Sequence, residues 1–102
     1  MSLQDKVVVI MGASSGIGAA TARLLAERGA KLTLAARRLA RLEEIKSAYP
    51  EASIETVEAD VTDMAAVQSV IDHTVAKFGR VDVLFNNAGI CLLYTSPSPR
   101  DG

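Results

Sequence analysis

Short apolar runs alternate along the chain with segments in which apolar residues recur at helical spacing. The first run, residues 7–11, is rich in β-branched side chains and predicts a strand buried on both faces of a parallel sheet. Further strands are predicted at 31–35, 54–59 and 81–85. Apolar and polar residues alternate in the third strand, which places it nearer the edge of the sheet.

Helices are predicted in the three segments between these strands. The first ends at Gly29, the second must end before Pro50, and the third is capped by Thr62 or Asp63 and ends at Gly79. The positions that recur at helical spacing are Ile17, Thr21, Leu24, Leu25 and Arg28; then Leu39, Leu42, Ile45 and Tyr49; then Val67, Val70, Ile71, Val75 and Phe78.

This alternation of strands and helices predicts parallel βαβ units joined by right-handed crossovers. The predicted fold class is α/β, with four parallel strands in the order 3-2-1-4. Such an arrangement is the first half of a doubly wound Rossmann sheet.

The segment after Ile90 breaks the pattern. Residues 91–101 contain two prolines, show no periodicity, and resemble one translated reading frame of a transposase sequencing adapter. We therefore predict a truncated domain at 1–90 and a non-native, disordered tail at 91–102, with an ordinary proline-rich loop as the alternative. Without a fifth strand, the apolar strand at 81–85 would leave an edge open to intermolecular pairing, which predicts poor solubility.

Composition narrows the possible partners and surroundings. A chain of 102 residues with 49% hydrophobic and 23% charged residues fits one globular domain. Eleven basic and twelve acidic residues give no basic field for nucleic acid. The single cysteine, Cys91, cannot form an internal disulfide, so we expect a reducing, cytoplasmic setting. No apolar run approaches the length of a membrane span.

A glycine-rich turn between the first strand and the first helix is the strongest candidate for chemistry. Backbone N–H groups and the helix dipole can receive a pyrophosphate there. Gly12 can make the tight turn, Gly16 lets the backbone approach the phosphates, and Gly18 permits close helix packing. Ser14 and Ser15 add hydroxyl donors. The alternative is a tight turn without a ligand.

The end of the second strand bears on the choice of cofactor. A dinucleotide site usually has an acidic residue there to hold the ribose 2′-hydroxyl, but this chain has Ala36 followed by Arg37 and Arg38. Arg37 could bind a 2′-phosphate by a charge-assisted contact, so NADP is favoured over NAD. Alternatively, both arginines lie on the solvated start of the second helix.

Two further polar segments follow strands three and four. Asp60 could accept from an adenine amino group, or it could be a turn residue before Thr62. The sequence Asn86-Asn87-Ala88-Gly89 could bind a ribose, or its amides could tie neighbouring strands together.

With these motifs in this order, residues 3–90 resemble the classical short-chain dehydrogenase/reductase family. Met11 is a departure, since the family usually has threonine before the first glycine. The resemblance implies that the pyrophosphate and its riboses are surrounded by Gly12, Ser14, Ser15, Gly16, Ile17 and Gly18. It also implies that Arg37 holds the 2′-phosphate, that Asp60 and Val61 hold the adenine, and that Asn87, Ala88 and Gly89 hold the nicotinamide-side ribose.

The resemblance also implies the reaction. In this family a tyrosine, made more acidic by a lysine and assisted by a serine, transfers a proton while the nicotinamide carries hydride. Those residues lie beyond strand four, so no catalytic residue is assigned; Tyr49 and Tyr94 are not candidates. We expect the full-length parent protein to be a homo-oligomeric, NADP-preferring oxidoreductase that acts on a small alcohol or carbonyl substrate. The 102-residue chain itself is expected to be inactive. The alternative is a non-catalytic dinucleotide-binding module.

Overall fold

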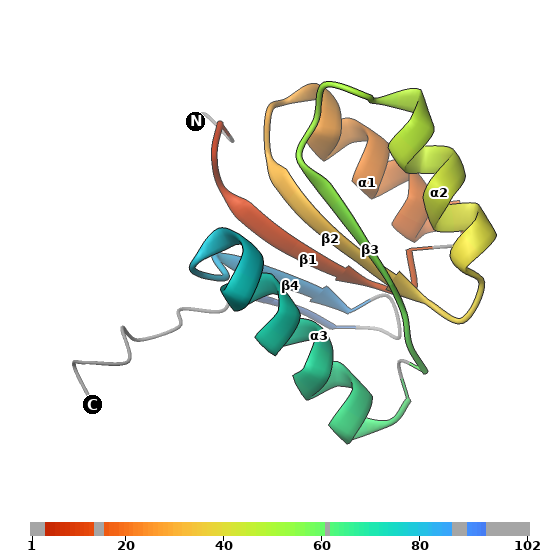
Figure 1. Cartoon of the computed structure of the whole chain (residues 1–102), viewed down its shortest axis with the longest axis vertical. Coiled ribbons are helices and arrows are strands. Elements are labelled where there is room, and N and C mark those ends of the chain that lie inside the picture. The colour runs from red at the N-terminus through yellow and green to blue at the C-terminus, as the bar shows by residue number, and fades with distance from the viewer. Residues whose placement is uncertain (1–3, 14–15, 61, 87–89, 94–102) are drawn as a thin grey trace.

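Five strands form one sheet in the computed structural model of the chain, which describes residues 4–13, 16–60, 62–86 and 90–93 (Figure 1). In chain order the elements are β1 (Val7–Met11), α1 (Gly16–Glu27), β2 (Lys31–Ala36), α2 (Leu39–Ala48), β3 (Ile54–Glu58), α3 (Met64–Phe78), β4 (Val83–Asn86) and β5 (Ile90–Leu93). The strand order is β3-β2-β1-β4-β5. The pairings among β1 to β4 are parallel, and β5 runs antiparallel to β4.

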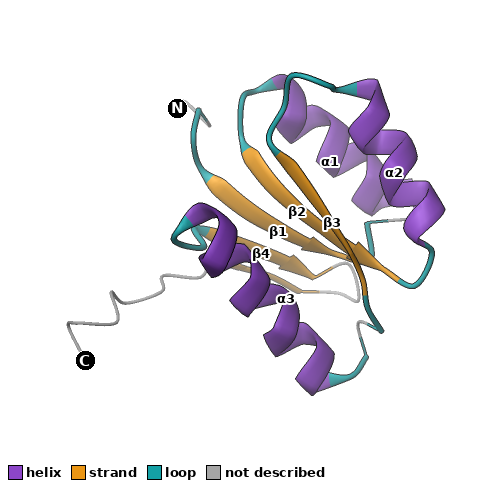
Figure 2. Ribbon diagram, in the orientation of Figure 1, coloured by secondary structure: helices purple, strands orange, loops and turns teal. Residues whose placement is uncertain are grey.

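The helices cover both faces of the sheet: α1 and α2 lie on one face and α3 on the other (Figure 2). The predicted α/β fold and the parallel strand order 3-2-1-4 are confirmed.

The central strand β1 contributes to two hydrophobic cores because successive side chains point to opposite faces. Val8 and Ile10 pack on the side of α1 and α2, whereas Val9 and Met11 pack on the side of α3. All five residues of β1 are buried, as expected for a strand covered on both faces.

The packed face of α1 consists of small residues. Gly18, Ala22 and Ala26 are buried, while Ile17 and Leu24 are 69% and 51% exposed. The larger side chains that reveal the helix in the sequence therefore do not all define its buried side. Small residues let the helix axis approach the sheet closely, and they fill this interface without long side chains.

The third helix is capped by Asp63 rather than by Thr62. The backbone N–H of Ala65 donates to the Asp63 carboxylate at 2.9 Å. At the other end Gly79 has a φ of 88°, a left-handed conformation that favours glycine, and its N–H donates to the Val75 carbonyl at 2.8 Å.

The prediction of a disordered tail from Cys91 is wrong for residues 91–93. These residues and Ile90 form β5, in which Cys91 pairs with Phe85 and Leu93 with Val83. The expected open edge on β4 is wrong for the same reason, because main-chain pairing with β5 covers it. Residues 94–102 lie outside the described part of the chain, and the division at residue 90 stays a prediction.

Candidate functional site

The candidate residues gather at the carboxyl edge of the sheet, defined here as the edge at which β1 to β4 end. Because these strands are parallel, their carboxyl ends lie at one edge of the sheet (Figure 1). The turn after β1, Arg37 after β2 and Asp60 after β3 all follow strand ends at this edge. Ligands of open α/β sheets bind at this kind of edge.

Gly12 and Gly18 shape the turn between β1 and α1. Gly12 has a φ of 76°, and the N–H groups of Gly12 and Ala13 both donate to the Ala35 carbonyl, at 2.8 and 3.2 Å. A Cβ at Gly18 would lie 2.6 Å from the Gly12 carbonyl oxygen and 2.9 Å from the Ala13 Cα. Gly12 therefore makes the tight turn and Gly18 the close packing that the sequence predicts for them.

Gly16 and Ile17 begin α1 on the open side of this turn. Apart from its chain neighbours and the nearby backbone of α1, no described atom lies within 4 Å of a Cβ built at Gly16, and the Ile17 side chain is exposed. The first N–H groups of a helix have no partner within it, so this helix end can receive an anion. The space above Gly16 leaves the backbone accessible to one.

Arg37 and Asp60 join the ends of β2 and β3. The Arg37 Nη2 donates to the Asp60 Oδ1 at 3.3 Å, and the two side chains are 70% and 47% exposed. Ala36, at the end of β2, is buried and provides no carboxylate. Arg37 therefore places an exposed positive charge at this corner of the site, where it forms an ion pair with Asp60.

Thr62 fixes the Asp60 carboxylate. Its N–H and its hydroxyl donate to Asp60 Oδ1 at 2.9 and 2.6 Å. The two Thr62 hydrogen bonds, followed by smaller contributions from Arg37, hold the pKa of Asp60 below its ordinary value. From the sequence Thr62 is predicted only as a candidate helix cap; the Asp-x-Thr spacing of an Asx turn is the signal for its role at Asp60.

Several predicted site residues lie outside the described part of the chain. They are Ser14, Ser15, Val61, Asn87, Ala88 and Gly89. The described residues bring together the glycine turn, Arg37 and Asp60.

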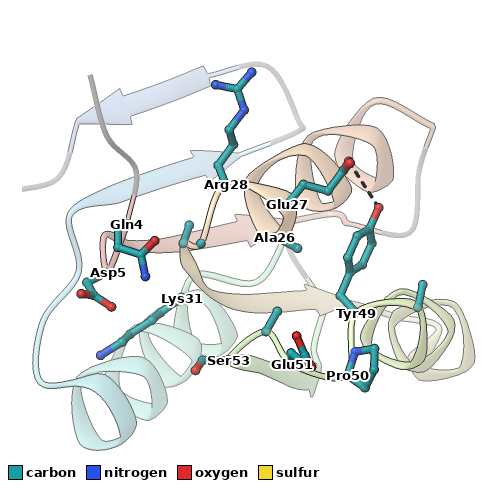
Figure 3. A pocket seen from close by; sticks show the side chains of 14 residues that line it. Gln4, Asp5, Ala26, Glu27, Arg28, Lys31, Tyr49, Pro50, Glu51 and Ser53 are labelled. Carbon is teal, nitrogen blue, oxygen red and sulfur yellow. Dashed lines mark hydrogen bonds between the residues drawn. The ribbon is translucent and has the colours of Figure 1, made fainter.

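A pocket of about 580 Å³ lies away from this edge, among the loops that precede β1, β2 and β3 (Figure 3). Gln4, Lys31 and Ser53 are among its lining residues. Tyr49 also lines it, and its hydroxyl donates to Glu27 at 3.4 Å. Tyr49 is therefore remote from the glycine turn, in keeping with its exclusion as a catalytic candidate.

His73 belongs to a surface ion-pair group with β3. Its Nε2 lies 3.0 Å from the Glu55 Oε1, and the Lys77 ammonium lies 4.0 Å from the other oxygen of Glu55. Within the described ranges, no three His, Cys, Asp or Glu side chains are grouped so that they could hold a metal ion. No helix of the described chain is long and apolar enough to cross a membrane.

Comparison with known proteins gives consistent matches. The family model described as short chain dehydrogenase matches residues 6–100. An uncharacterized oxidoreductase of Staphylococcus saprophyticus is 52% identical over 87% of this chain, and levodione reductase of Leifsonia aquatica is 47% identical over 84%. A crystal structure of a short chain dehydrogenase/reductase from Burkholderia phymatum in complex with NAD superposes with a TM-score of 0.77 at 35% identity over 82% of this chain.

The chain spans only about a third of these proteins. It covers 36% of the Staphylococcus protein, 34% of the levodione reductase and 31% of the Burkholderia chain.

Proposed function

This chain belongs to the short-chain dehydrogenase family, a family of oxidoreductases, and on that premise we propose that it is the cofactor-binding part of an NADP-preferring enzyme. The reaction we propose for the whole protein is the interconversion of an alcohol and a carbonyl by hydride transfer. The observation that carries the cofactor preference is Arg37, exposed at the carboxyl edge beside a strand end that has no carboxylate.

The glycine turn fits the pyrophosphate of a dinucleotide. The left-handed conformation of Gly12 and the close packing of Gly18 shape the turn, and the open space at Gly16 lets phosphate oxygens approach the start of α1, where the helix dipole favours an anion. We propose that Ser14, Ser15 and Ile17 line the same part of the site. The nicotinamide, when bound, would supply the atom that carries hydride.

The adenosine end would lie toward Arg37 and Asp60. A ribose 2′-phosphate carries a charge of about −1.5 to −2, and a guanidinium can bind it by two parallel hydrogen bonds. We propose that Asp60 and Val61 contact the adenine, and that Asn87, Ala88 and Gly89 contact the ribose on the nicotinamide side.

For the whole protein we propose a small-molecule substrate, a homo-oligomeric state and a cytoplasmic location. A relative named levodione reductase supports a carbonyl substrate class. We assign no catalytic residue to this chain, and we propose that the 102 residues alone do not turn over.

Binding of reduced cofactors to the chain tests the cofactor preference. We expect NADPH to bind more tightly than NADH, and R37A to weaken NADPH binding by about tenfold with little effect on NADH, because only NADPH has the 2′-phosphate. Titration of cofactor fluorescence measures both. The control R38A removes the same charge one residue later and should change neither affinity; equal affinities for the two cofactors in the unaltered chain would refute the preference.

The catalytic proposal is tested on the uninterrupted coding sequence from the source DNA. We expect the reading frame beyond codon 90 to contain a serine and then a tyrosine four residues before a lysine, and its product to reduce carbonyl compounds with NADPH. A natural reading frame without that tyrosine and lysine would instead favour the non-catalytic dinucleotide-binding module.

A further inference from the structure

The Asp60 carboxylate is hydrogen-bonded to Arg37, the cation of the candidate 2′-phosphate site. Arg37 Nη2 donates to Asp60 Oδ1 at 3.3 Å, across the ends of two neighbouring strands. The two residues are 23 positions apart in the sequence, so the contact is created by the fold. Any anion that binds Arg37 meets this carboxylate as a competitor.

The Asp60 carboxylate has hydrogen bonds that do not involve Arg37. Two donors from Thr62 hold Asp60 Oδ1 at 2.9 and 2.6 Å, both shorter than the contact to Arg37. The pKa of Asp60 is lowered mainly by these Thr62 bonds, so the group is charged at neutral pH. A ligand can displace Arg37 from Asp60 without displacing Asp60 from the site.

We propose that Asp60 competes with the ribose 2′-phosphate for Arg37 and thereby limits how strongly the site discriminates NADP from NAD. This inference rests on the proposed cofactor function and adds a residue that sets its specificity. An acidic residue at the end of β2 would repel a 2′-phosphate. Asp60, which follows the neighbouring strand β3, exerts part of this repulsion instead.

The size of the effect follows from exposure. An ion pair between side chains that are 70% and 47% exposed is weak, worth roughly one- to fivefold in an equilibrium constant. We therefore expect the more highly charged phosphate to displace Asp60 as the partner of Arg37. The Asp60 carboxylate that remains nearby still repels the phosphate. Asp60 thus moderates the preference for NADP without reversing it.

Two mononucleotides isolate this effect in the 102-residue chain. Adenosine 2′,5′-bisphosphate and adenosine 5′-monophosphate differ only in the 2′-phosphate. The dissociation constant of the monophosphate divided by that of the bisphosphate therefore measures the preference for the 2′-phosphate, and a higher ratio means a stronger preference. Any loss of an adenine contact in D60N affects both ligands and cancels in the ratio. Calorimetric titrations of the unaltered chain, D60N, R37A and D60N/R37A complete a double-mutant cycle.

We expect D60N to raise the preference for the 2′-phosphate by roughly two- to fivefold, and to have no such effect when Arg37 is already alanine. E58Q is the matched control, because it removes the same charge from the end of β3 but leaves Arg37 and Asp60 intact. Its ratio should equal that of the unaltered chain. Circular dichroism of each variant establishes that the fold is retained.

The outcomes separate this inference from the cofactor proposal. If R37A lowers the ratio but D60N leaves it unchanged or lowers it, Asp60 is not a competitor and this inference fails alone. An equal rise in E58Q and D60N would show a general field effect and would also overturn it. If R37A leaves the ratio unchanged, the NADP preference itself is wrong.

Discussion

At the scale of single residues, two glycines of the same turn face different surroundings. A Cβ on Gly18 would lie 2.6 Å from a backbone carbonyl, whereas one on Gly16 meets no described atom within 4 Å beyond its chain neighbours and the nearby backbone of α1. Gly18 is thus needed for the fold, and Gly16 has no comparable packing role among the described residues. A glycine motif in a sequence does not separate these roles, because the difference depends on which backbone lies above each Cα.

The pair G18A and G16A distinguishes folding from binding. We expect G18A to destabilise the chain by about 1–3 kcal/mol, because backbone atoms must shift to admit the methyl group. G16A should keep its stability within about 0.5 kcal/mol but weaken NADPH binding by about tenfold or more, because the methyl group fills the space for the phosphates. Urea unfolding and cofactor titration measure the two effects. Normal NADPH binding by G16A would show that the dinucleotide does not approach this turn.

At the scale of elements, periodicity predicts which segments are helices and strands better than it predicts which side is buried. The run at 7–11 matches the strand β1 to the residue, since its short length and β-branched residues favour a strand buried on both faces. The predicted strand at 81–85 is observed as Val83–Asn86. Asp82 lies just before this strand and forms two hydrogen bonds with Val7: its backbone N–H donates to the Val7 carbonyl, and its carboxylate accepts from the Val7 N–H. The apolar pattern of the sequence does not reveal this arrangement.

The helix α1 shows the same limit, because its buried side is formed by glycine and alanine. A22L should destabilise the chain by about 1–3 kcal/mol, since Ala22 is fully buried against the sheet and the larger side chain overpacks the interface. L24K should change stability by no more than about 0.5 kcal/mol, because Leu24 is 51% exposed. Thermal and urea unfolding compare the two variants. A large loss in L24K with none in A22L would mean that the helix is rotated relative to this structure.

At the scale of the whole molecule, the positions of the site residues follow from the topology, but the contacts among them do not. Parallel strands in the order 3-2-1-4 bring the glycine turn, Arg37 and Asp60 to one edge, so the general place of the site was predictable. The Arg37–Asp60 bond and its support from Thr62 required side-chain geometry. The sequence does not predict the strand β5, because a four-residue apolar segment carries no periodic signal of its own and two prolines follow within six residues of its end.

The four residues of β5 pair with β4 and cover its edge. A chain ending at residue 89 would expose the backbone edge of β4, and we expect it to self-associate and to lose about 1–4 kcal/mol of stability, since each cross-strand pair contributes roughly 0.2–1 kcal/mol. A chain ending at residue 93 keeps β5 and should match the full chain in both respects. Light scattering after size-exclusion chromatography, together with urea unfolding, compares the three. Equal stability and a monomeric state for the shortest chain would show that β5 does not protect this edge, and that β4 alone resists the intermolecular pairing expected of an apolar edge strand.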